Sequence, residues 1–255
     1  MQLTLVQIAV ILAAGFVAGF VNALAGGGSF LSLAALEMAG LSAALANGTN
    51  RVALVVESVL AFFGFRSKGV SDLRQSVQFA IPALLGAIVG AYVIIELPTI
   101  IFHRALAVAM LIMLVTIVFN PGRWLQQRQI VMTPRQRLLA YPVFFLIGIY
   151  GGAIQAGVGF FLMAALVLLA GLDLVRTNSH KAVIVGVYTL FALGMFAWRG
   201  QVHWVLGLAL AVGNGSGAWI AGRLAAERGE RVVRIVLGAA LILLALRYLG
   251  ILTLF

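Results

Sequence analysis

The stretch NALAGGGSFLSLAALEMAGLSAALANGTNR at residues 22–51 decides the fold, because residues 153–182 repeat its pattern as AIQAGVGFFLMAALVLLAGLDLVRTNSHKA. The offset of 131 residues places Gly26 on Gly157, Gly28 on Gly159 and Asn47 on Asn178. Both stretches are mainly apolar and are interrupted by glycine. Duplicated, glycine-broken apolar segments are typical of secondary transporters, whose binding sites lie where the broken segments meet.

The composition around these stretches is that of a membrane protein. Of the 255 residues, 63% are hydrophobic and 9% are charged, and the mean hydropathy is +1.13. Soluble domains carry about 25% charged residues. At about 20 apolar residues per membrane crossing, a chain of this length has room for about eight to ten helices and no sizeable soluble domain. We therefore expect one helical bundle in a lipid bilayer.

Charge and cysteine content exclude several classes of function. The net charge is +10, but the 17 Lys and Arg residues lie mostly in short links between apolar segments. There they orient the protein and contact lipid headgroups, so no nucleic-acid partner is predicted. The absence of cysteine excludes disulfides, thiolate catalysis and sulfur-ligated metals. No Walker motif is present, and we predict no cofactor and no metal site.

The apolar segments fall into two sets of five on either side of a polar link. The first set covers residues 5–25, 30–45, 52–65, 77–97 and 101–119, and the second covers residues 138–154, 160–172, 182–198, 205–220 and 232–246. We predict a first transmembrane repeat at 1–119, a cytoplasmic linker at 120–137 and a second transmembrane repeat at 138–255. The fold class is an all-α polytopic membrane protein with ten segments, the second of each repeat being short or broken.

The basic residues predict that the second repeat is inverted relative to the first. Five crossings per repeat, an odd number, would invert the second half. Counting all ten segments as spans places most basic residues on the side of the linker, and leaves four on the other side: Arg51, Arg104, Arg199 and Arg247. The positive-inside rule then makes the linker cytoplasmic and puts both termini outside. Treating the short pair as re-entrant divides the charges almost evenly.

Glycines at the start of both short segments are candidates for binding an anion. Gly26, Gly27 and Gly28 precede the first short segment, and Gly157 and Gly159 precede the second. Without side chains, consecutive N–H groups at the start of a helix can point at one anion, helped by the helix dipole. Close helix packing is the alternative, since small residues are routine at membrane helix interfaces. Their duplication favours the binding site.

A polar cluster follows each short segment, and each cluster ends in a fixed cation. The candidate ligands are Asn47, Thr49, Asn50 and Arg51 in the first repeat, and Asn178, Ser179, His180 and Lys181 in the second. Amides, hydroxyls and cations can replace the hydration shell of a small oxyanion. The alternative is that these residues are ordinary helix N-caps. On the binding interpretation, Arg51→Ala and Lys181→Ala remove anion binding and leave the protein folded.

Further polar residues lie inside the apolar segments. Glu57 follows Asn50 by two helical turns, and its repeat counterpart is Tyr188. A carboxylate within a membrane helix normally faces a cavity or a partner, which predicts proton coupling or gating, with a structural ion pair to Arg51 as the alternative. Asn22 and Gln155 precede the two glycine runs, where each amide can coordinate an ion or form an interhelical hydrogen bond.

The chain resembles the TauE/SafE family of sulfite exporters, also described as four-toluene sulfonate uptake permeases. The resemblance is carried by Gly15 and Gly19, the glycines at 26–28, the run Asn-Gly-Thr-Asn at 47–50, and a weaker echo in the second half. It implies a bacterial inner-membrane permease for sulfite, sulfonates or sulfoacetate, coupled to an ion gradient. The implied partners are a small anionic substrate, the lipid bilayer and, as coupling ions, protons.

Taken together, these patterns predict a secondary transporter that is not an enzyme. The anion site would lie near the membrane midplane, and one repeat would rock against the other to open it to each face. A passive anion channel, a carrier of a small carboxylate and a homodimeric assembly stay open as alternatives. His180 beside Ser179 is a weak candidate for catalysis, because neighbouring residues on a helix point about 100° apart.

Overall fold

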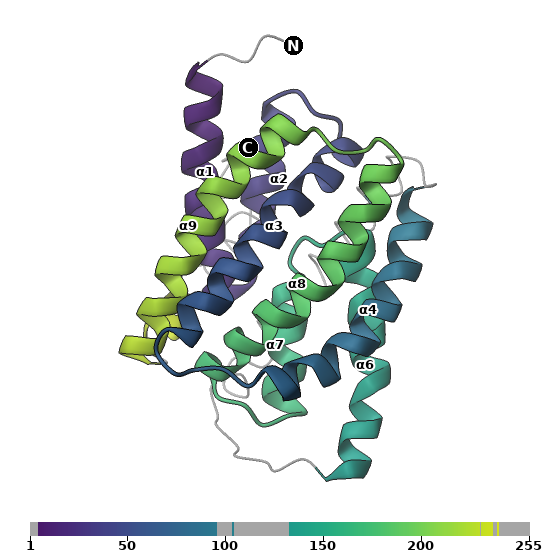
Figure 1. Cartoon of the computed structure of the whole chain (residues 1–255), viewed down its shortest axis with the longest axis vertical. Helices are drawn as coiled ribbons and strands as arrows, with labels where there is room; N and C mark the ends of the chain where they lie inside the picture. The colour runs from purple at the N-terminus through teal and green to yellow at the C-terminus, as the bar shows by residue number, and fades with distance from the viewer. Residues whose placement is uncertain (1–4, 96–103, 105–132, 230, 237–238, 240–255) are drawn as a thin grey trace.

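The computed structural model describes residues 5–95, 104, 133–229, 231–236 and 239, and this part of the chain is helical without a strand (Figure 1). The first half contributes α1 (Leu5–Ala25), α2 (Ser29–Met38), α3 (Ala43–Arg66) and α4 (Leu73–Ile95). The second half contributes α6 (Pro134–Ala153), α7 (Val158–Leu168), α8 (Leu174–Trp198) and α9 (Trp204–Arg228). The predicted all-α membrane fold is confirmed.

Five of the described helices are long and apolar enough to cross a membrane: α1, α3, α4, α8 and α9. The predicted first segment, 5–25, matches α1 residue for residue. The predicted segment 101–119 and most of the linker 120–137 lie outside the described residues, as does most of the predicted segment 232–246. The predicted division into two repeats and a linker therefore stays a prediction.

The two short helices are shorter than the sequence pattern predicts. α2 has 10 residues and α7 has 11. At 1.5 Å per residue each is about 15 to 17 Å long, which is half of a hydrocarbon core. Each is followed by a glycine with positive φ, Gly40 at 95° and Gly171 at 66°. Such a glycine ends a helix without steric cost, so the apolar residues beyond it belong to the next connection.

The polar clusters lie inside helices α3 and α8, whereas the sequence pattern placed them before the helices. The N-caps are further upstream, where Ser42 accepts a hydrogen bond from Leu45 N and Asp173 accepts one from Arg176 N. Asn47 and Asn178 thus begin the second helical turn rather than capping the first. Their side chains donate to other helices, Asn47 to Ala153 of α6 and Asn178 to Leu24 of α1, and Asn178 also donates to Leu174 of its own helix.

Glycine-mediated contacts set the helix pairs that hold the bundle together. α9 packs against α1 and α3, and α4 packs against α6 and α8. A Cβ on Gly19 of α1 would lie 2.1 Å from the carbonyl oxygen of Asn214, and a Cβ on Gly152 of α6 would lie 2.1 Å from that of Ala87. The fourth described helix of each half, α4 or α9, thus packs against helices of the other half. A two-fold relation between the halves would produce this arrangement.

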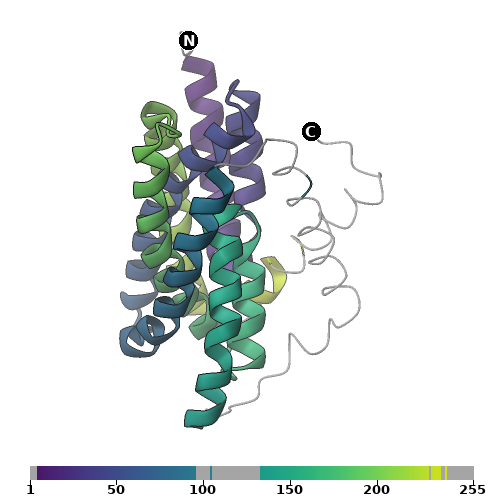
Figure 2. The same cartoon turned by 90° about the vertical axis from the view of Figure 1, so that its right-hand side faces the viewer.

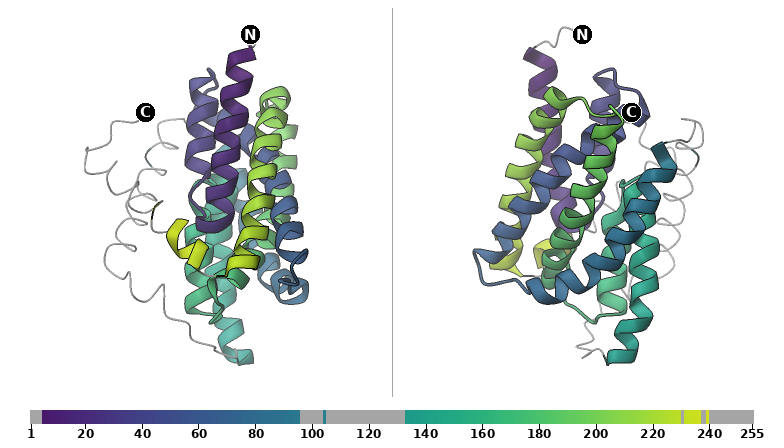
Figure 3. Two further views of the ribbon diagram at one scale, coloured as in Figure 1. Left: turned by 90° about the vertical axis from the view of Figure 1, so that its left-hand side faces the viewer. Right: turned by 45° about the vertical axis from the view of Figure 1, so that its right-hand side comes forward.

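Two helical hairpins enter the molecule from opposite ends. Figure 3 shows α1 and α2 side by side in the upper part of the molecule, and Figure 2 shows α6 at the lower edge. The hairpin tips meet inside, where a Cβ on Gly159 would lie 2.3 Å from the Cα of Gly26. The breaks between α1 and α2 and between α6 and α7 are therefore in contact, and they position the candidate site.

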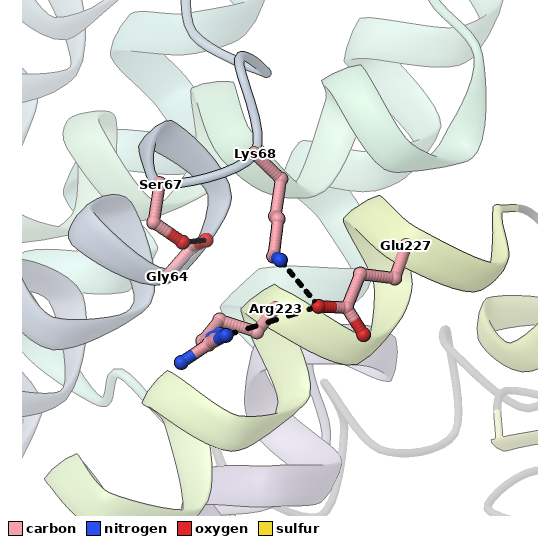
Figure 4. A network of polar contacts seen from close by, with 5 residues as sticks. All are labelled: Gly64, Ser67, Lys68, Arg223 and Glu227. Atoms are coloured by element: carbon pink, nitrogen blue, oxygen red, sulfur yellow. Dashed lines mark hydrogen bonds and ion pairs between the residues drawn. The ribbon is translucent and has the colours of Figure 1, made fainter.

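Helices α3 and α9 both end at the lower end of Figure 1, and ion pairs link the residues near these two ends. Lys68 Nζ lies 2.6 Å from Glu227 Oε1, and an Arg223 guanidinium nitrogen lies 3.9 Å from the same oxygen (Figure 4). These side chains are partly exposed, so the network contributes little stability. It does join the end of α3 to the end of α9, which come from different halves of the chain.

Candidate functional site

A layer of buried polar side chains lies where the two hairpin tips meet. Most of the predicted site residues are buried in it, and none of these exposes more than 8% of its surface. The buried polar residues that the sequence pattern singled out are Asn22, Asn47, Thr49, Asn50, Arg51, Glu57, Gln155, Asn178, Ser179, His180 and Lys181. A buried polar group without partners is costly, so the hydrogen bonds of this layer reveal what each side chain does.

Lys181 and Asn178 of α8 cap the C-terminal end of α1. Lys181 Nζ donates to the carbonyl oxygens of Asn22 and Ala23 at 2.8 and 3.2 Å, and to Asn178 Oδ1 at 2.6 Å. Asn178 Nδ2 donates to the carbonyl oxygen of Leu24 at 2.9 Å. All three ammonium protons have an acceptor. A cation at this position also complements the negative end of the α1 dipole.

Arg51 and Asn47 of α3 make the corresponding cap on α6. The Arg51 guanidinium donates to the carbonyl oxygens of Gly151 and Gly152 at 3.2 and 2.5 Å, and Asn47 Nδ2 donates to that of Ala153 at 2.8 Å. The guanidinium also lies over the ring of Phe196, 4.4 Å from its centroid. Each half of the chain thus caps the first helix of the other half with an asparagine and a cation.

Glu57 is held by two amides rather than by an ion pair to Arg51. Asn22 Nδ2 donates to one carboxylate oxygen at 2.5 Å, and Asn214 Nδ2 donates to the other at 2.9 Å. Asn214 was missed by the sequence analysis. The available signal was an amide in the middle of an apolar, glycine-rich helix, in the run Gly-Asn-Gly-Ser-Gly at 213–217.

A small cavity of about 20 Å³ lies among these groups. Its volume is about that needed for one water molecule. Its wall brings together six of the predicted site residues, from α1, α3, α7, α8 and the break before α7: Asn22, Glu57, Gln155, Gly159, Asn178 and Lys181. The α7 helix begins at Val158, so the positive end of its dipole lies at this cavity.

The other predicted site residues lie away from the cavity wall. Thr49 Oγ1 accepts a hydrogen bond from His203 N at 2.9 Å, towards the α8–α9 connection. Ser179 Oγ donates to the carbonyl oxygen of Val70 at 3.1 Å, and His180 Nδ1 lies 2.7 Å from Ser76 Oγ, towards the start of α4. These two side chains, which precede Lys181 in the sequence, therefore point away from the cavity and towards the start of α4.

Tyr188 and three of the predicted glycines also have defined positions. A Cβ on Gly151 would lie 2.8 Å from the Tyr188 hydroxyl, so Tyr188 lies beside the end of α6 as Glu57 lies beside the end of α1. A Cβ on Gly28 would lie 1.8 Å from the carbonyl oxygen of Ala18, and one on Gly27 would lie 2.6 Å from the Phe160 ring. Gly157 has a φ of 75°. Close packing thus requires the glycines whether or not they bind an anion.

A larger polar vestibule of about 780 Å³ lies at the lower end of the molecule. It is lined by the α3–α4 connection, the start of α8 and the pair Ser179 and His180. On the opposite side of α8, Asn178 and Lys181 face the small cavity. The vestibule therefore lies at a basic end of the molecule: Arg74 and Arg176 line it, Arg66 and Arg228 end α3 and α9, and Lys68 and Arg223 pair with Glu227.

The vestibule gives a test of the predicted orientation. The natural chain has no cysteine, so Ser71→Cys introduces a unique thiol at an exposed position on the vestibule wall. We expect a membrane-impermeant maleimide to label it after permeabilisation and not in intact cells, because the positive-inside rule predicts that the basic end faces the cytoplasm. Ser32→Cys, at a fully buried position in α2, is the control and should stay unlabelled. Labelling of Ser71→Cys in intact cells would contradict the predicted orientation and place the vestibule on the outside.

Among the described residues, no three His, Asp or Glu side chains gather as a metal-binding group. The features assembled here are instead two broken helical hairpins, a buried polar layer and five helices able to cross a membrane. These features define a class of protein, the polytopic membrane transporters with discontinuous helices.

The comparisons with known proteins agree with this class. The family model of the sulfite exporter TauE/SafE matches residues 11–248, and the chain belongs to this family. It is 26% identical over 243 residues to the "Probable membrane transporter protein ORF9" of Sinorhizobium sp., covering 95% of this chain and 92% of that protein. It is 28% identical over 232 residues to a "Probable membrane transporter protein" of Haemophilus influenzae, covering 89% and 88%.

A third relative is "Probable membrane transporter protein YfcA" of Escherichia coli K12, which is 27% identical over 222 residues, covering 85% of this chain and 80% of that protein. No solved structure matches the chain. The protein is thus an integral membrane transporter of the TauE/SafE family, and the buried layer is where its substrate site is to be sought.

Proposed function

We propose that the protein is a secondary permease of the bacterial inner membrane that carries a small organosulfur anion, such as sulfite, a sulfonate or sulfoacetate. The single observation that supports this best is the charge of the buried side chains, which among the described residues include two basic groups, Arg51 and Lys181, and one carboxylate, Glu57. The surplus positive charge lies in a low-dielectric interior, where it attracts an anion strongly.

The ligands of the anion would come from the cavity wall. The three donors of Lys181 and the terminal guanidinium nitrogens of Arg51 are already hydrogen-bonded, so these two side chains would act on the anion mainly through their charge. The direct donors would be the amide of Asn22, once Glu57 releases it, and the N–H of Gly159 in the first turn of α7. Half-helix N-termini in broken membrane helices are known to face anionic substrate groups in this way.

The transport cycle would be alternating access. A cavity of about 20 Å³ is too small for a sulfur oxyanion, so the site must widen before an anion enters. The vestibule at the basic end provides the approach from that face. Transport requires a second state in which the route from the opposite face is open, with the hairpin tips remaining between the two routes.

A binding panel tests the proposal first. Purified protein is heated with sulfite, thiosulfate, sulfate, sulfoacetate, 4-toluenesulfonate or, as the carboxylate control, acetate. A ligand at about 100 times its Kd stabilises a protein by about 2.7 kcal/mol, so selective binding by one sulfur anion appears as a raised Tm. An equal response to acetate, or no response to any anion, would contradict the organosulfur assignment.

Reconstituted vesicles then separate a carrier from a channel. A carrier accumulates the binding anion against its own gradient when a proton gradient is imposed, and its flux saturates. A passive channel equilibrates the anion without accumulation. Saturating, gradient-driven accumulation is expected here.

A further inference from the structure

We propose that the Glu57 carboxylate is a tethered substitute for the substrate, occupying the anion's donors in the empty protein and yielding them when it takes up a proton. This inference rests on the proposed function and specifies its coupling ion. One proton and one monoanion would then move together.

The hydrogen bonds of Glu57 carry the argument. Its two oxygens accept from Asn22 Nδ2 and Asn214 Nδ2, and it lies in the cavity wall with Lys181 and Asn178. Amide donors and a nearby ammonium are what a small oxyanion would need. The cavity beside the carboxylate has room for about one water. The carboxylate thus fills the place that an incoming anion requires.

Charge balance supplies the coupling. While Glu57 is ionised, its charge offsets that of Lys181, and a second anion beside it would meet a like charge at short range. When the carboxylate takes up a proton from solvent, it becomes a neutral acid and no longer needs both amide donors. The anion can then bind the freed amides, with Lys181 balancing its charge. Releasing the proton and the anion to the other face restores the starting state.

The groups around Glu57 leave few competing titrations. α1 and α9 present the neutral amides of Asn22 and Asn214. α8 presents Lys181 and, two turns further along, Tyr188, while Arg51 lies on α3 itself and bonds to the end of α6. Lys181 is the group whose titration could resemble that of Glu57 in a binding experiment. A variant of Glu57 alone separates the two.

Glu57→Gln is the decisive variant because it mimics the protonated side chain. Its amide oxygen can keep one asparagine, and Asn214, whose Oδ1 has no hydrogen-bond partner within the described structure, can turn to accept from its amide nitrogen. The fold should therefore persist, which size-exclusion chromatography verifies. The matched control is Glu37→Gln, since Glu37 is an exposed carboxylate on α2.

The probes are 4-toluenesulfonate, a monoanion as the proposal requires, and thiosulfate, a dianion; neither anion changes its charge over the neutral pH range of the experiment. In the wild type and in Glu37→Gln, affinity should fall by about tenfold per pH unit on the alkaline side of the Glu57 titration. In Glu57→Gln it should be high and independent of pH, and anion flux in vesicles should no longer carry protons. Asn214→Ala, which removes one donor from the carboxylate, should move the midpoint of the profile to higher pH.

Each outcome decides one of the two proposals. If Glu57→Gln keeps the wild-type pH profile, or if the wild-type affinity is flat with pH, the tethered carboxylate is wrong and the anion permease stands. If neither probe binds the wild type at any pH, and the wider panel is silent, the proposed function fails and this inference fails with it.

Discussion

Arg51→Ala is expected to destabilise the protein by about 1–3 kcal/mol for each buried carbonyl oxygen that loses its donor. The guanidinium supplies hydrogen bonds to the last carbonyl oxygens of α6, from Gly151 to Ala153. Alanine would leave these acceptors, inside a membrane protein, with fewer donors than they need, and each unsatisfied group is costly there. It would also leave a void beside Phe196, over which the guanidinium lies.

The measurement is the Tm of the detergent-solubilised variant, followed by size-exclusion chromatography after heating. Arg66→Ala is the matched control, because Arg66 is an exposed arginine at the end of the same helix. Its Tm should stay close to that of the wild type. Equal Tm values for both variants would show that the cap on α6 is dispensable. An Arg51→Ala variant that folds but binds no anion would favour the direct binding role predicted by the sequence.

Gly159→Ala is expected to have the second large effect, because it pushes the two hairpin tips apart. The added Cβ would lie 2.3 Å from the Cα of Gly26, and backbone at that distance cannot move aside as a flexible side chain can. Overpacking of this kind costs about 1–3 kcal/mol or more. Since Gly159 also lines the small cavity, transport and anion binding should fall together with stability.

Gly194→Ala provides the control for this substitution. A Cβ on Gly194 of α8 would have no atom within 4 Å, so the change adds no clash. Alanine is favoured over glycine within a helix by about 1 kcal/mol, so the Tm should be unchanged or slightly raised. Transport by both variants is compared in the same vesicles. Full activity of Gly159→Ala would mean that the tips are not held in close contact during the cycle.

The sequence predicted well those features that depend on periodicity and composition. The membrane class, the bounds of α1, and the presence of short helices after each glycine run follow from the length and polarity of the apolar segments. Tertiary partners were not predictable in the same way. Arg51 and Lys181 bond to carbonyl oxygens at least 100 residues away in the sequence, at Gly151, Gly152 and Asn22. No local sequence pattern predicts such a contact.

Helix geometry explains why the predicted site was only partly assembled. Successive residues on a helix point about 100° apart, whereas those three or four apart share a face. Asn178 and Lys181 therefore reach the cavity together, while Ser179 and His180 between them face α4 and the vestibule. Once the clusters are known to lie inside α3 and α8, the same rule separates cavity residues from the rest. Asn214 was not predicted as a site residue because the equivalent position in the first repeat, 131 residues earlier, is Ala83.

The exchange of fourth helices between the halves means that the repeat in the sequence is not the mechanical unit. One body consists of α1, α2, α3 and α9, and the other of α6, α7, α8 and α4. The described chain passes from one body to the other through the α3–α4 and α8–α9 connections. Each connection holds a glycine with positive φ, Gly69 at 78° and Gly200 at 69°, with open space where a Cβ would be. If the two bodies rock as the proposed alternating access requires, these repeat-equivalent glycines are where we expect the backbone to bend.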